Sequence, residues 1–214
     1  MKISEIFYSI EGEGIEIGTP EVFVRLSGCN LKCDWCDTKY SWNQGQEMTL
    51  TEVLSEIEKY PSKNVSITGG EPLLQKKELQ QLATKLKALG YSIRVNTNGT
   101  LFDKKIFDSI DLITMDCKCP SSGEESDLEV IKKTKTMYPN KTQFKFVISN
   151  KTDYEYGKRI LQSDLKEAKN AVIQPQWKKK SFTRKLAQLM LQDKLNVRLI
   201  LQQHKIIWGE KKGV

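Results

Sequence analysis

Apolar residues recur along this chain in two patterns. Short runs rich in β-branched and aromatic residues alternate with longer segments in which apolar residues lie three or four positions apart. The first pattern predicts strands over residues 21–27, 64–68, 92–97, 112–116, 142–148, 171–174 and 196–201. The second predicts helices over residues 49–60, 77–89, 103–110, 128–137, 153–163 and 183–193. Such an alternation of strand and helix is typical of βαβ units with a mostly parallel sheet.

Local signals mark the ends of several of these elements. Thr49 or Thr51 is placed to cap the first helix, and Pro61 ends it. Gly90 stops the second helix. The glycine-containing segment 11–14 is expected to be a polar loop, either a plain hairpin loop or a place where backbone approaches a ligand.

The first predicted strand contains an arginine among apolar residues. Period-two alternation places three aliphatic residues on one face and Phe23 with Arg25 on the other. An arginine that points into a core or a barrel lumen needs a partner, and a carboxylate suits it best because it accepts two parallel hydrogen bonds. An arginine at a sheet edge, exposed to water, is the alternative.

Polar residues follow most of the predicted strands at the point where each strand ends. The segments concerned are 28–38, 69–72, 98–99, 116–118, 174–176 and 202–204. In parallel sheets the ligand binds at the carboxyl ends of the strands. The recurrence therefore predicts one shared site built from these six segments.

Three cysteines stand close together in the first of these segments. Cys29, Cys33 and Cys36 have the spacing C-x3-C-x2-C, and an odd number of thiols cannot all pair as disulfides. Thiolates are the usual ligands of soft metals and of iron–sulfur clusters, and cubane clusters ordinarily take four of them. Three would leave one iron open to a small chelating molecule.

A structural zinc site is the alternative use of these thiols. It needs a fourth ligand, and none lies nearby in the sequence. Zinc would have to recruit Cys117, Cys119 or His204. Cys117 and Cys119 are two residues apart at a strand end, and we interpret them as reduced buried thiols, since two cysteines are too few for a second cluster.

Length and hydropathy limit the architecture. The chain has 214 residues, which suits a single domain over residues 1–214 and leaves a closed eight-fold barrel cramped, because such barrels typically need about 250 residues. There is no run of 18 apolar residues and no apolar signal core at the N-terminus. We therefore expect no membrane association and a cytoplasmic location, where thiols stay reduced.

The formal net charge is +7, and lysine pairs are spread along the chain. A basic surface that binds nucleic acid is one interpretation. We favour a solvated lysine-rich surface with no direct nucleic-acid contact, because the pairs are scattered and lack interleaved aromatic residues. Such a field would still attract a small substrate that carries a carboxylate.

The cysteine spacing followed by Gly69-Gly70-Glu71-Pro72 resembles the radical S-adenosylmethionine superfamily. The resemblance implies a partial, open (β/α) barrel in which Cys29, Cys33 and Cys36 hold a [4Fe-4S] cluster and the open iron chelates S-adenosylmethionine. The cofactor contacts that it implies are Gly70, Asp116, Cys117, Lys118, Gln174, Pro175, Gln176 and Trp177. Glu71 could instead only cap the helix that follows.

Further features narrow the resemblance. The segment 8–14, the Cys36-Asp37-Thr38 end of the cysteine loop and the segments 201–205 and 208–214 resemble the 7-carboxy-7-deazaguanine synthase family over almost the whole chain. This implies a carbon–nitrogen lyase that converts 6-carboxy-5,6,7,8-tetrahydropterin to 7-carboxy-7-deazaguanine with release of ammonia, in the 7-deazapurine pathway to queuosine and archaeosine in tRNA.

The same resemblance implies Mg²⁺ bound by Thr38, although a loop or cap hydroxyl is the alternative for that residue. It implies substrate contacts at Ile10, Glu11, Gly12, Arg25, Thr68 and His204. Glu11 stands where many relatives have glutamine, and a carboxylate accepts hydrogen bonds but cannot donate them. The segment 116–118 differs from the more usual Ser-Pro-Lys. His204, the only histidine, could equally be a surface or capping residue.

Two other functions are compatible with parts of the sequence. A glycyl-radical activating enzyme of the same superfamily would share the cysteine spacing and the size. A zinc-stabilised nucleic-acid-binding module would use the basic surface. For the favoured function we expect a flavodoxin or ferredoxin as electron donor and a homodimer.

Overall fold

One curved sheet runs through the computed structural model, which describes all residues 1–214. Its nine strands lie in the order β3-β1-β2-β4-β5-β6-β7-β8-β9. They are β1 Lys2–Ile10, β2 Pro20–Leu26, β3 Gln46–Glu47, β4 Asn64–Gly69, β5 Ser92–Thr97, β6 Leu112–Asp116, β7 Thr142–Ile148, β8 Ala171–Pro175 and β9 Arg198–Leu199. From β2 to β9 every neighbouring pair is parallel, and β1 is antiparallel to β2 and β3.

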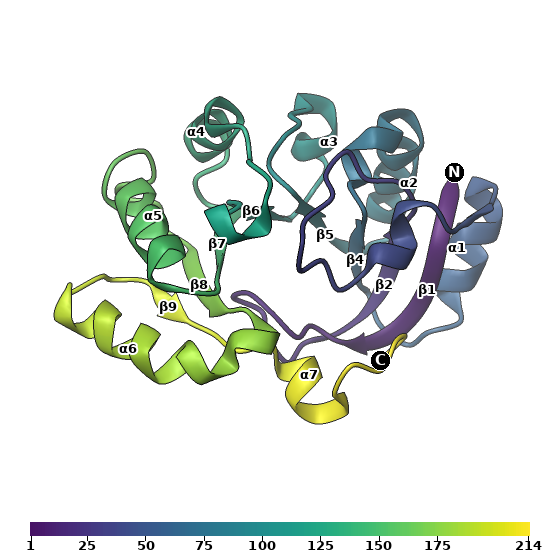
Figure 1. The fold of residues 1–214 in the computed structure, drawn as a ribbon. Coiled ribbons are helices and arrows are strands. Elements are labelled where there is room, and N and C mark those ends of the chain that lie inside the picture. The colour runs from purple at the N-terminus through teal and green to yellow at the C-terminus, as the bar shows by residue number, and fades with distance from the viewer.

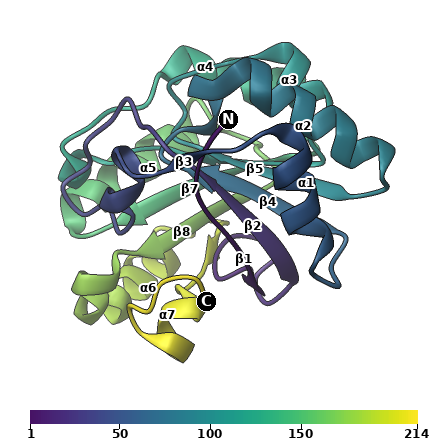
Figure 2. The same ribbon diagram turned by 90° about the vertical axis from the view of Figure 1, so that its right-hand side faces the viewer.

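The larger helices follow strands and cover the outer, convex side of the sheet (Figure 1). They are α1 Leu50–Glu58, α2 Lys76–Ala88, α3 Lys104–Asp108, α4 Leu128–Met137, α5 Lys151–Gln162 and α6 Thr183–Gln192. The last helix, α7 Gln203–Trp208, lies near β1 in both views, although the two elements are far apart in the sequence (Figures 1 and 2). The expected partial, open (β/α) barrel with a mostly parallel sheet is confirmed.

The predicted alternation of elements is confirmed for most of the chain, and four elements differ, one of which is the short strand β3, which was not predicted. Residues 2–10 form a strand that the hydrophobic pattern did not indicate, because most of its residues are only partly buried. The last predicted strand, 196–201, shortens to Arg198–Leu199. The six residues of α7 were not predicted as a helix.

The two faces of the inner strands have different neighbours. Val22, Val24 and Leu26 of β2 are completely buried in a core cluster of 36 residues between sheet and helices. Phe23 and Arg25 point to the concave face, as alternation along the strand predicted. One face of the sheet therefore stabilises the fold, and the other is free to line a site.

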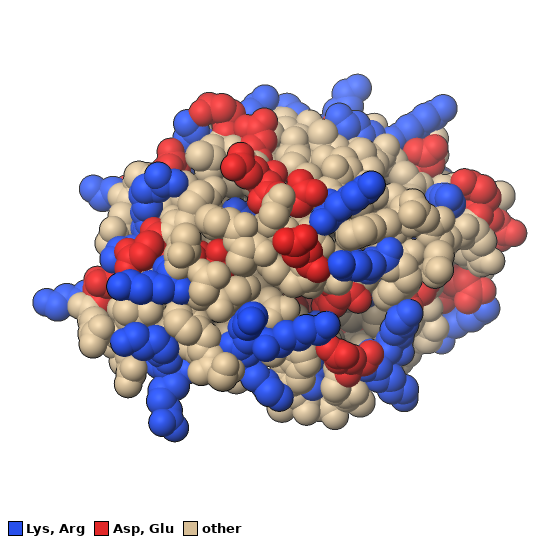
Figure 3. Space-filling view, in the orientation of Figure 1, with Lys and Arg blue, Asp and Glu red and all other residues tan.

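The surface carries both signs of charge. Lysine and arginine side chains are interspersed with aspartate and glutamate over the face drawn in Figure 3. No helix has the length and apolar character that crossing a lipid bilayer would demand.

The start of α1 allows a direct test of helix capping by the predicted residues. The Glu52 amide donates to Thr49 Oγ1 at 3.3 Å, and the Thr49 amide donates to Glu52 Oε2 at 2.7 Å, which completes a capping box. Thr49→Ala should lower the free energy of unfolding by about 1 kcal/mol, measured by urea denaturation. Thr51→Ala is the matched control, because Thr51 is exposed inside the helix. Equal losses in the two variants would contradict the capping assignment.

Candidate functional site

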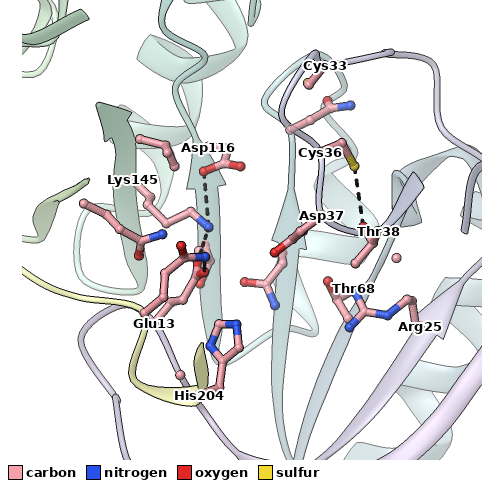
Figure 4. A pocket seen from close by; sticks show the side chains of 18 of the residues that line it. Glu13, Arg25, Cys33, Cys36, Asp37, Thr38, Thr68, Asp116, Lys145 and His204 are labelled. Atoms are coloured by element: carbon pink, nitrogen blue, oxygen red, sulfur yellow. Dashed lines mark hydrogen bonds and ion pairs between the residues drawn. The ribbon is translucent and has the colours of Figure 1, made fainter. Parts of the chain in front are cut away.

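A pocket opens on the concave face at the carboxyl ends of the parallel strands (Figure 4). All six polar segments that the sequence singled out contribute to its lining. The predicted convergence on one site is therefore confirmed. The lining also includes residues from the end of β1 and from the α7 segment, so the loop after β1 and the C-terminal segment meet at the same pocket.

The cysteine loop forms one wall of the pocket. Cys29, Cys33 and Cys36 are all free thiols, and all three line the cavity. Burial raises the pKa of Cys29 and of Cys33, so proton release must accompany metal binding there. Three soft donors on one wall are the set that an incompletely ligated iron–sulfur cluster requires.

A tight backbone contact holds this loop against the end of β4. A Cβ placed on Gly70 would overlap the carbonyl oxygen of Gly28 and crowd the Cys29 side chain. The Glu71 amide donates to that same Gly28 carbonyl at 2.8 Å. Gly70 therefore has a steric reason to lack a side chain, because the cysteine loop could not otherwise approach β4.

Glu71 does more than cap the turn after it. Its carboxylate is completely buried and accepts from the Leu73 amide at 3.0 Å, which caps the 3-10 turn Pro72–Gln75. It also accepts from Thr97 Oγ1 at 2.9 Å and from the Asn98 amide at 2.7 Å. Burial raises the pKa of Glu71, and these donors oppose that rise. The carboxylate therefore ties β4 to the end of β5.

The thiols that a zinc site would have to recruit lie elsewhere. Cys117 and Cys119 belong to the hydrophobic core, and the Cys119 thiol donates to the Cys117 carbonyl at 3.7 Å. No group of three or more His, Cys, Asp or Glu side chains is arranged to hold a single metal ion. The donor set therefore suits a cluster better than tetrahedral zinc, since structural zinc sites have four protein ligands.

Most of the expected cofactor contacts line the same pocket as the cysteines. Gly70, Asp116, Lys118, Gln174, Gln176 and Trp177 line the pocket, whereas Cys117 and Pro175 do not. The side-chain oxygens of Gln174 and Gln176 are buried without a hydrogen-bond donor. Buried acceptors without partners are rare, so two of them in one wall fit a ligand that brings donors such as an ammonium or hydroxyl groups.

All six expected substrate residues line the same pocket: Ile10, Glu11, Gly12, Arg25, Thr68 and His204. A Cβ on Gly12 would overlap the His204 ring, so the absence of a side chain there admits the imidazole. Burial lowers the pKa of His204, which keeps the ring neutral near pH 7. In Figure 4 Arg25 and Thr68 lie together, across the pocket from Glu13.

Glu11 is already engaged by the protein. Its carboxylate forms an ion pair with Arg94 and accepts from the Glu13 amide at 2.8 Å. Arg94 also pairs with Glu16, and with Glu21 at 3.0 Å. Burial, and then the charge of Glu16, raise the pKa of Glu21 to about 8. A substrate contact by the Glu11 side chain stays a prediction, and Arg94 supplies a physical reason for a carboxylate at this position.

Arg25 has a protein partner and still faces the cavity. Its Nε donates to Glu5 Oε1 at 2.6 Å, and Tyr40 Oη donates to the same oxygen at 2.6 Å. No acceptor of the chain bonds to the two terminal nitrogens of Arg25. The predicted carboxylate partner of this arginine is thus Glu5 at one edge, while the other edge is free for a ligand.

The Thr38 hydroxyl is not used as a cap. Thr38 precedes the 3-10 turn Lys39–Trp42, but its side chain makes no capping hydrogen bond. Its Oγ1 lies 3.7 Å from the Cys36 sulfur, and Thr38 lines the pocket. The cap alternative for this residue is therefore wrong, whereas the loop-hydroxyl alternative stays open through the contact with Cys36, and the Mg²⁺ role stays a prediction.

Sequence reasoning missed a buried ion-pair chain in the pocket. Lys145 Nζ lies 2.7 Å from Glu13 Oε2 and 3.4 Å from Asp116 Oδ1. One signal could have found it: Lys145 stands between Phe144 and Phe146 and is the only charged residue of its strand. A charge in the middle of such a strand, on the face opposite the aromatic pair, indicates a lumen position with a partner.

The C-terminal segment closes the pocket from the side of β1. The Gln203 amide donates to the Gly12 carbonyl at 2.9 Å, and Lys205 pairs with Asp37 of the cysteine loop at 2.7 Å. Val214, the last residue, also lines the pocket. Contacts of α7 therefore join the β1 loop to the cysteine loop.

The contact at Gly70 gives a testable consequence. Gly70→Ala should displace the cysteine loop, because the atom in the way is a backbone oxygen that cannot rotate aside. We expect the iron and sulfide bound after anaerobic reconstitution to fall well below the wild-type level. Gly12→Ala is the matched control: its obstacle is a side chain, so iron content should be retained. Full iron content in Gly70→Ala would contradict this account of the loop.

Comparison with known proteins agrees with this geometry. A family model described as the radical SAM superfamily matches residues 23–116. A protein of Koribacter versatilis named 7-carboxy-7-deazaguanine synthase is 37% identical, with 100% of both chains covered. One of the same name from Methanospirillum hungatei is 39% identical over 97% of this chain and 85% of its own.

Among solved structures, the crystal structure of QueE from Escherichia coli has a TM-score of 0.75 and 25% sequence identity, and the match covers 95% of this chain and 94% of that one. These two sequence relatives match over nearly the whole chain and share one name, and Cys29, Cys33 and Cys36 line the concave pocket. This chain therefore belongs to the 7-carboxy-7-deazaguanine synthase family of radical S-adenosylmethionine enzymes.

Proposed function

We propose that this chain is a radical S-adenosylmethionine lyase that converts 6-carboxy-5,6,7,8-tetrahydropterin to 7-carboxy-7-deazaguanine with release of ammonia. The product serves 7-deazapurine synthesis for queuosine or archaeosine in tRNA. One observation carries the proposal: a single pocket brings the three free cysteines together with Arg25, an arginine that has an open edge. It thus combines a cluster wall with a site for a carboxylate.

The cluster and the cofactor have a defined wall to occupy. Cys29, Cys33 and Cys36 would hold a [4Fe-4S] cluster, and the cluster supplies the electron for reductive cleavage of bound S-adenosylmethionine. Gly70 leaves its backbone accessible, and Gln174 and Gln176 offer buried oxygens to the donors of the cofactor. The indole rings of Trp35 and Trp177 line the pocket as well, which limits access of water to the reacting atoms.

The substrate binds opposite this wall. The terminal nitrogens of Arg25 would receive the carboxylate of the pterin in a two-hydrogen-bond pair, and Glu5 fixes the orientation of the guanidinium. Thr68 lies beside Arg25, and the neutral His204 ring closes the other side of the cavity (Figure 4). Ile10, Glu11 and Gly12 bring the end of β1 to the same substrate.

Mg²⁺ is part of the proposal through Thr38. The Thr38 hydroxyl lines the pocket and makes no capping hydrogen bond. Mg²⁺ prefers oxygen ligands and commonly takes only one or two from the protein, with substrate and water supplying the rest. An ion at Thr38 would share the substrate carboxylate with Arg25.

The proposal extends to location, assembly and partners. The 214 residues act as one domain, in a reducing cytoplasm where the three thiols stay available to iron. The net charge of +7 favours association with an acidic electron donor such as a flavodoxin or a ferredoxin. We also propose a homodimer.

Turnover is the direct test of the function. Reduced, cluster-loaded protein incubated anaerobically with S-adenosylmethionine, Mg²⁺ and the carboxypterin should form 7-carboxy-7-deazaguanine and ammonia, measured by mass spectrometry. Cys33→Ala, which removes one proposed cluster ligand, is the inactive control. Cluster-loaded wild-type protein that forms no deazaguanine would contradict the proposal and favour a glycyl-radical activating enzyme. A colourless preparation with zinc and no iron would favour the nucleic-acid-binding module.

Two variants at Thr38 test the magnesium site. Thr38→Val keeps the shape of the side chain and removes its oxygen, so stimulation of turnover by Mg²⁺ should be lost while iron content is unchanged. Thr38→Ser keeps the hydroxyl and should retain the stimulation. The measurement is the initial rate of deazaguanine formation against Mg²⁺ concentration. Loss of iron in Thr38→Val would instead assign the residue a structural role in the cysteine loop.

A further inference from the structure

The proposed function assigns no part to Lys145, a nearly buried lysine whose side chain is only 14% exposed. Lys145 lies in the middle of β7 and faces the pocket, with Asp116 as its register neighbour on β6. Figure 4 shows its ammonium group between Glu13 and Asp116, with an interaction drawn to each. Lys145 therefore links Glu13, in the loop after β1, to Asp116 at the end of β6.

The contacts around this lysine form a chain of alternating charge. Lys145 Nζ donates to Glu13 Oε2 at 2.7 Å and lies 3.4 Å from Asp116 Oδ1. The other oxygen of Asp116 pairs with Lys118 at 2.8 Å. On the opposite side, Gln202 Nε2 donates to Glu13 Oε1 at 2.7 Å. Each oxygen of Glu13 thus has one protein donor, and the carboxylate is held from two directions.

We propose that Lys145 is a positioning residue for the substrate. Lys145 holds the Glu13 carboxylate so that the remaining lone pairs of this carboxylate face the N–H groups of the bound heterocycle. The proposal rests on the proposed function, since it takes a pterin as the ligand. A carboxylate has about four acceptor sites, and Lys145 and Gln202 occupy two. The remaining sites suit ring N–H and amino groups, which only a hydrogen-bond acceptor can recognise.

Charge supports this assignment. Burial disfavours the ionised form of Glu13, but Lys145, His204 and the hydrogen bonds from Lys145 and Gln202 outweigh it and lower the pKa of Glu13 to about 2. Burial likewise disfavours the cationic form of Lys145, but Asp116, Glu13 and the more distant Asp37 raise its pKa. Lys118 pairs with the other oxygen of Asp116, so the Asp116 carboxylate is shared by the two lysines.

Removal of Lys145 therefore has a defined consequence for Glu13. Burial would then be opposed chiefly by the Gln202 hydrogen bond, because the neutral His204 ring carries no charge near pH 7, and the pKa of Glu13 would rise. A protonated Glu13 has an O–H donor at one of its oxygens. This donor would face the substrate N–H groups, whose hydrogen bonds the ionised form accepts, so binding would weaken.

Equilibrium binding of the carboxypterin to cluster-loaded protein with S-adenosylmethionine tests the proposal by calorimetry. Lys145→Met and Glu13→Gln should each raise Kd by about tenfold or more, the effect of one lost charged hydrogen bond. The double variant should bind no more weakly than the worse single variant, because both substitutions remove the same interaction. The proposal would be overturned if the increase in Kd of the double variant equalled the product of the increases in the two single variants. It would also be overturned if Lys145→Met left Kd unchanged.

Lys87→Met is the matched control. Lys87 also pairs with a carboxylate, Asp111 at 2.7 Å, but on the surface, and it should leave Kd unchanged. Iron content and melting temperature are measured for every variant. If Lys145→Met does not fold, Lys145→Gln replaces it, because a neutral amide removes the charge and keeps a polar group in the pocket. A rise in Kd of about tenfold or more in Lys145→Gln supports the proposal, and an unchanged Kd overturns it.

The pH dependence separates positioning from a purely structural role. The affinity for the carboxypterin should fall as the pH is lowered. In Lys145→Met this fall should begin at a higher pH than in the wild type, because the pKa of Glu13 is higher. The Glu13→Gln variant should lack this acid limb. An unshifted limb in Lys145→Met would overturn the proposal while the wild type still converts the carboxypterin. Wild-type protein that neither binds nor converts the carboxypterin would refute the proposed function, and the role of Lys145 with it.

Discussion

The cysteine loop is held against the sheet by a backbone contact that leaves no room for a side chain. Gly70 packs on the Gly28 carbonyl, and the Glu71 amide donates to the same oxygen. The buried Glu71 carboxylate then fixes this corner to the end of β5 through Thr97 and Asn98. Further along the loop, Asn98 Nδ2 donates to Asn30 Oδ1 at 2.9 Å and the Asp34 amide donates to the Ser122 carbonyl at 2.9 Å, so the segment that carries the cluster ligands is held at several points.

The concave face is organised by charge compensation. Arg25 pairs with Glu5, Arg94 with three carboxylates, and Lys145 with two. Unpaired charges are costly to bury, so each of these side chains needs a partner before the cavity can be shielded from water. The partners also make the side chains rigid, which is what a site that must orient a small heterocycle requires.

The loop after β1 and the C-terminal segment meet at this cavity. Gln203 bonds to Gly12, Gln202 bonds to Glu13, and Lys205 reaches Asp37. The open sheet has β3 and β9 as its edges, and α7, which follows β9 in the chain, lies near β1 (Figure 2). Substrate contacts from the end of β1 and from His204 are therefore positioned by one set of interactions.

By itself, the sequence determined the βαβ order, most strand and helix boundaries, and the convergence of polar segments at one edge. It did so because periodicity and strand-end chemistry are local: Cys29, Cys33 and Cys36 lie within eight residues, and Gly70 follows its strand directly. Strand β1 was missed because both of its faces are partly exposed, so that its residues do not alternate clearly.

Only the tertiary structure decided which charges pair. Lys145 and Glu13 are 132 residues apart, and Gln202 and Glu13 are 189 apart. Glu11 lies 83 residues from Arg94 in the sequence, so the sequence alone did not reveal this partner, and the Glu11 carboxylate was assigned to the substrate. A pairing between distant strands depends on the curvature of the whole sheet, and no local pattern of residues encodes that distance.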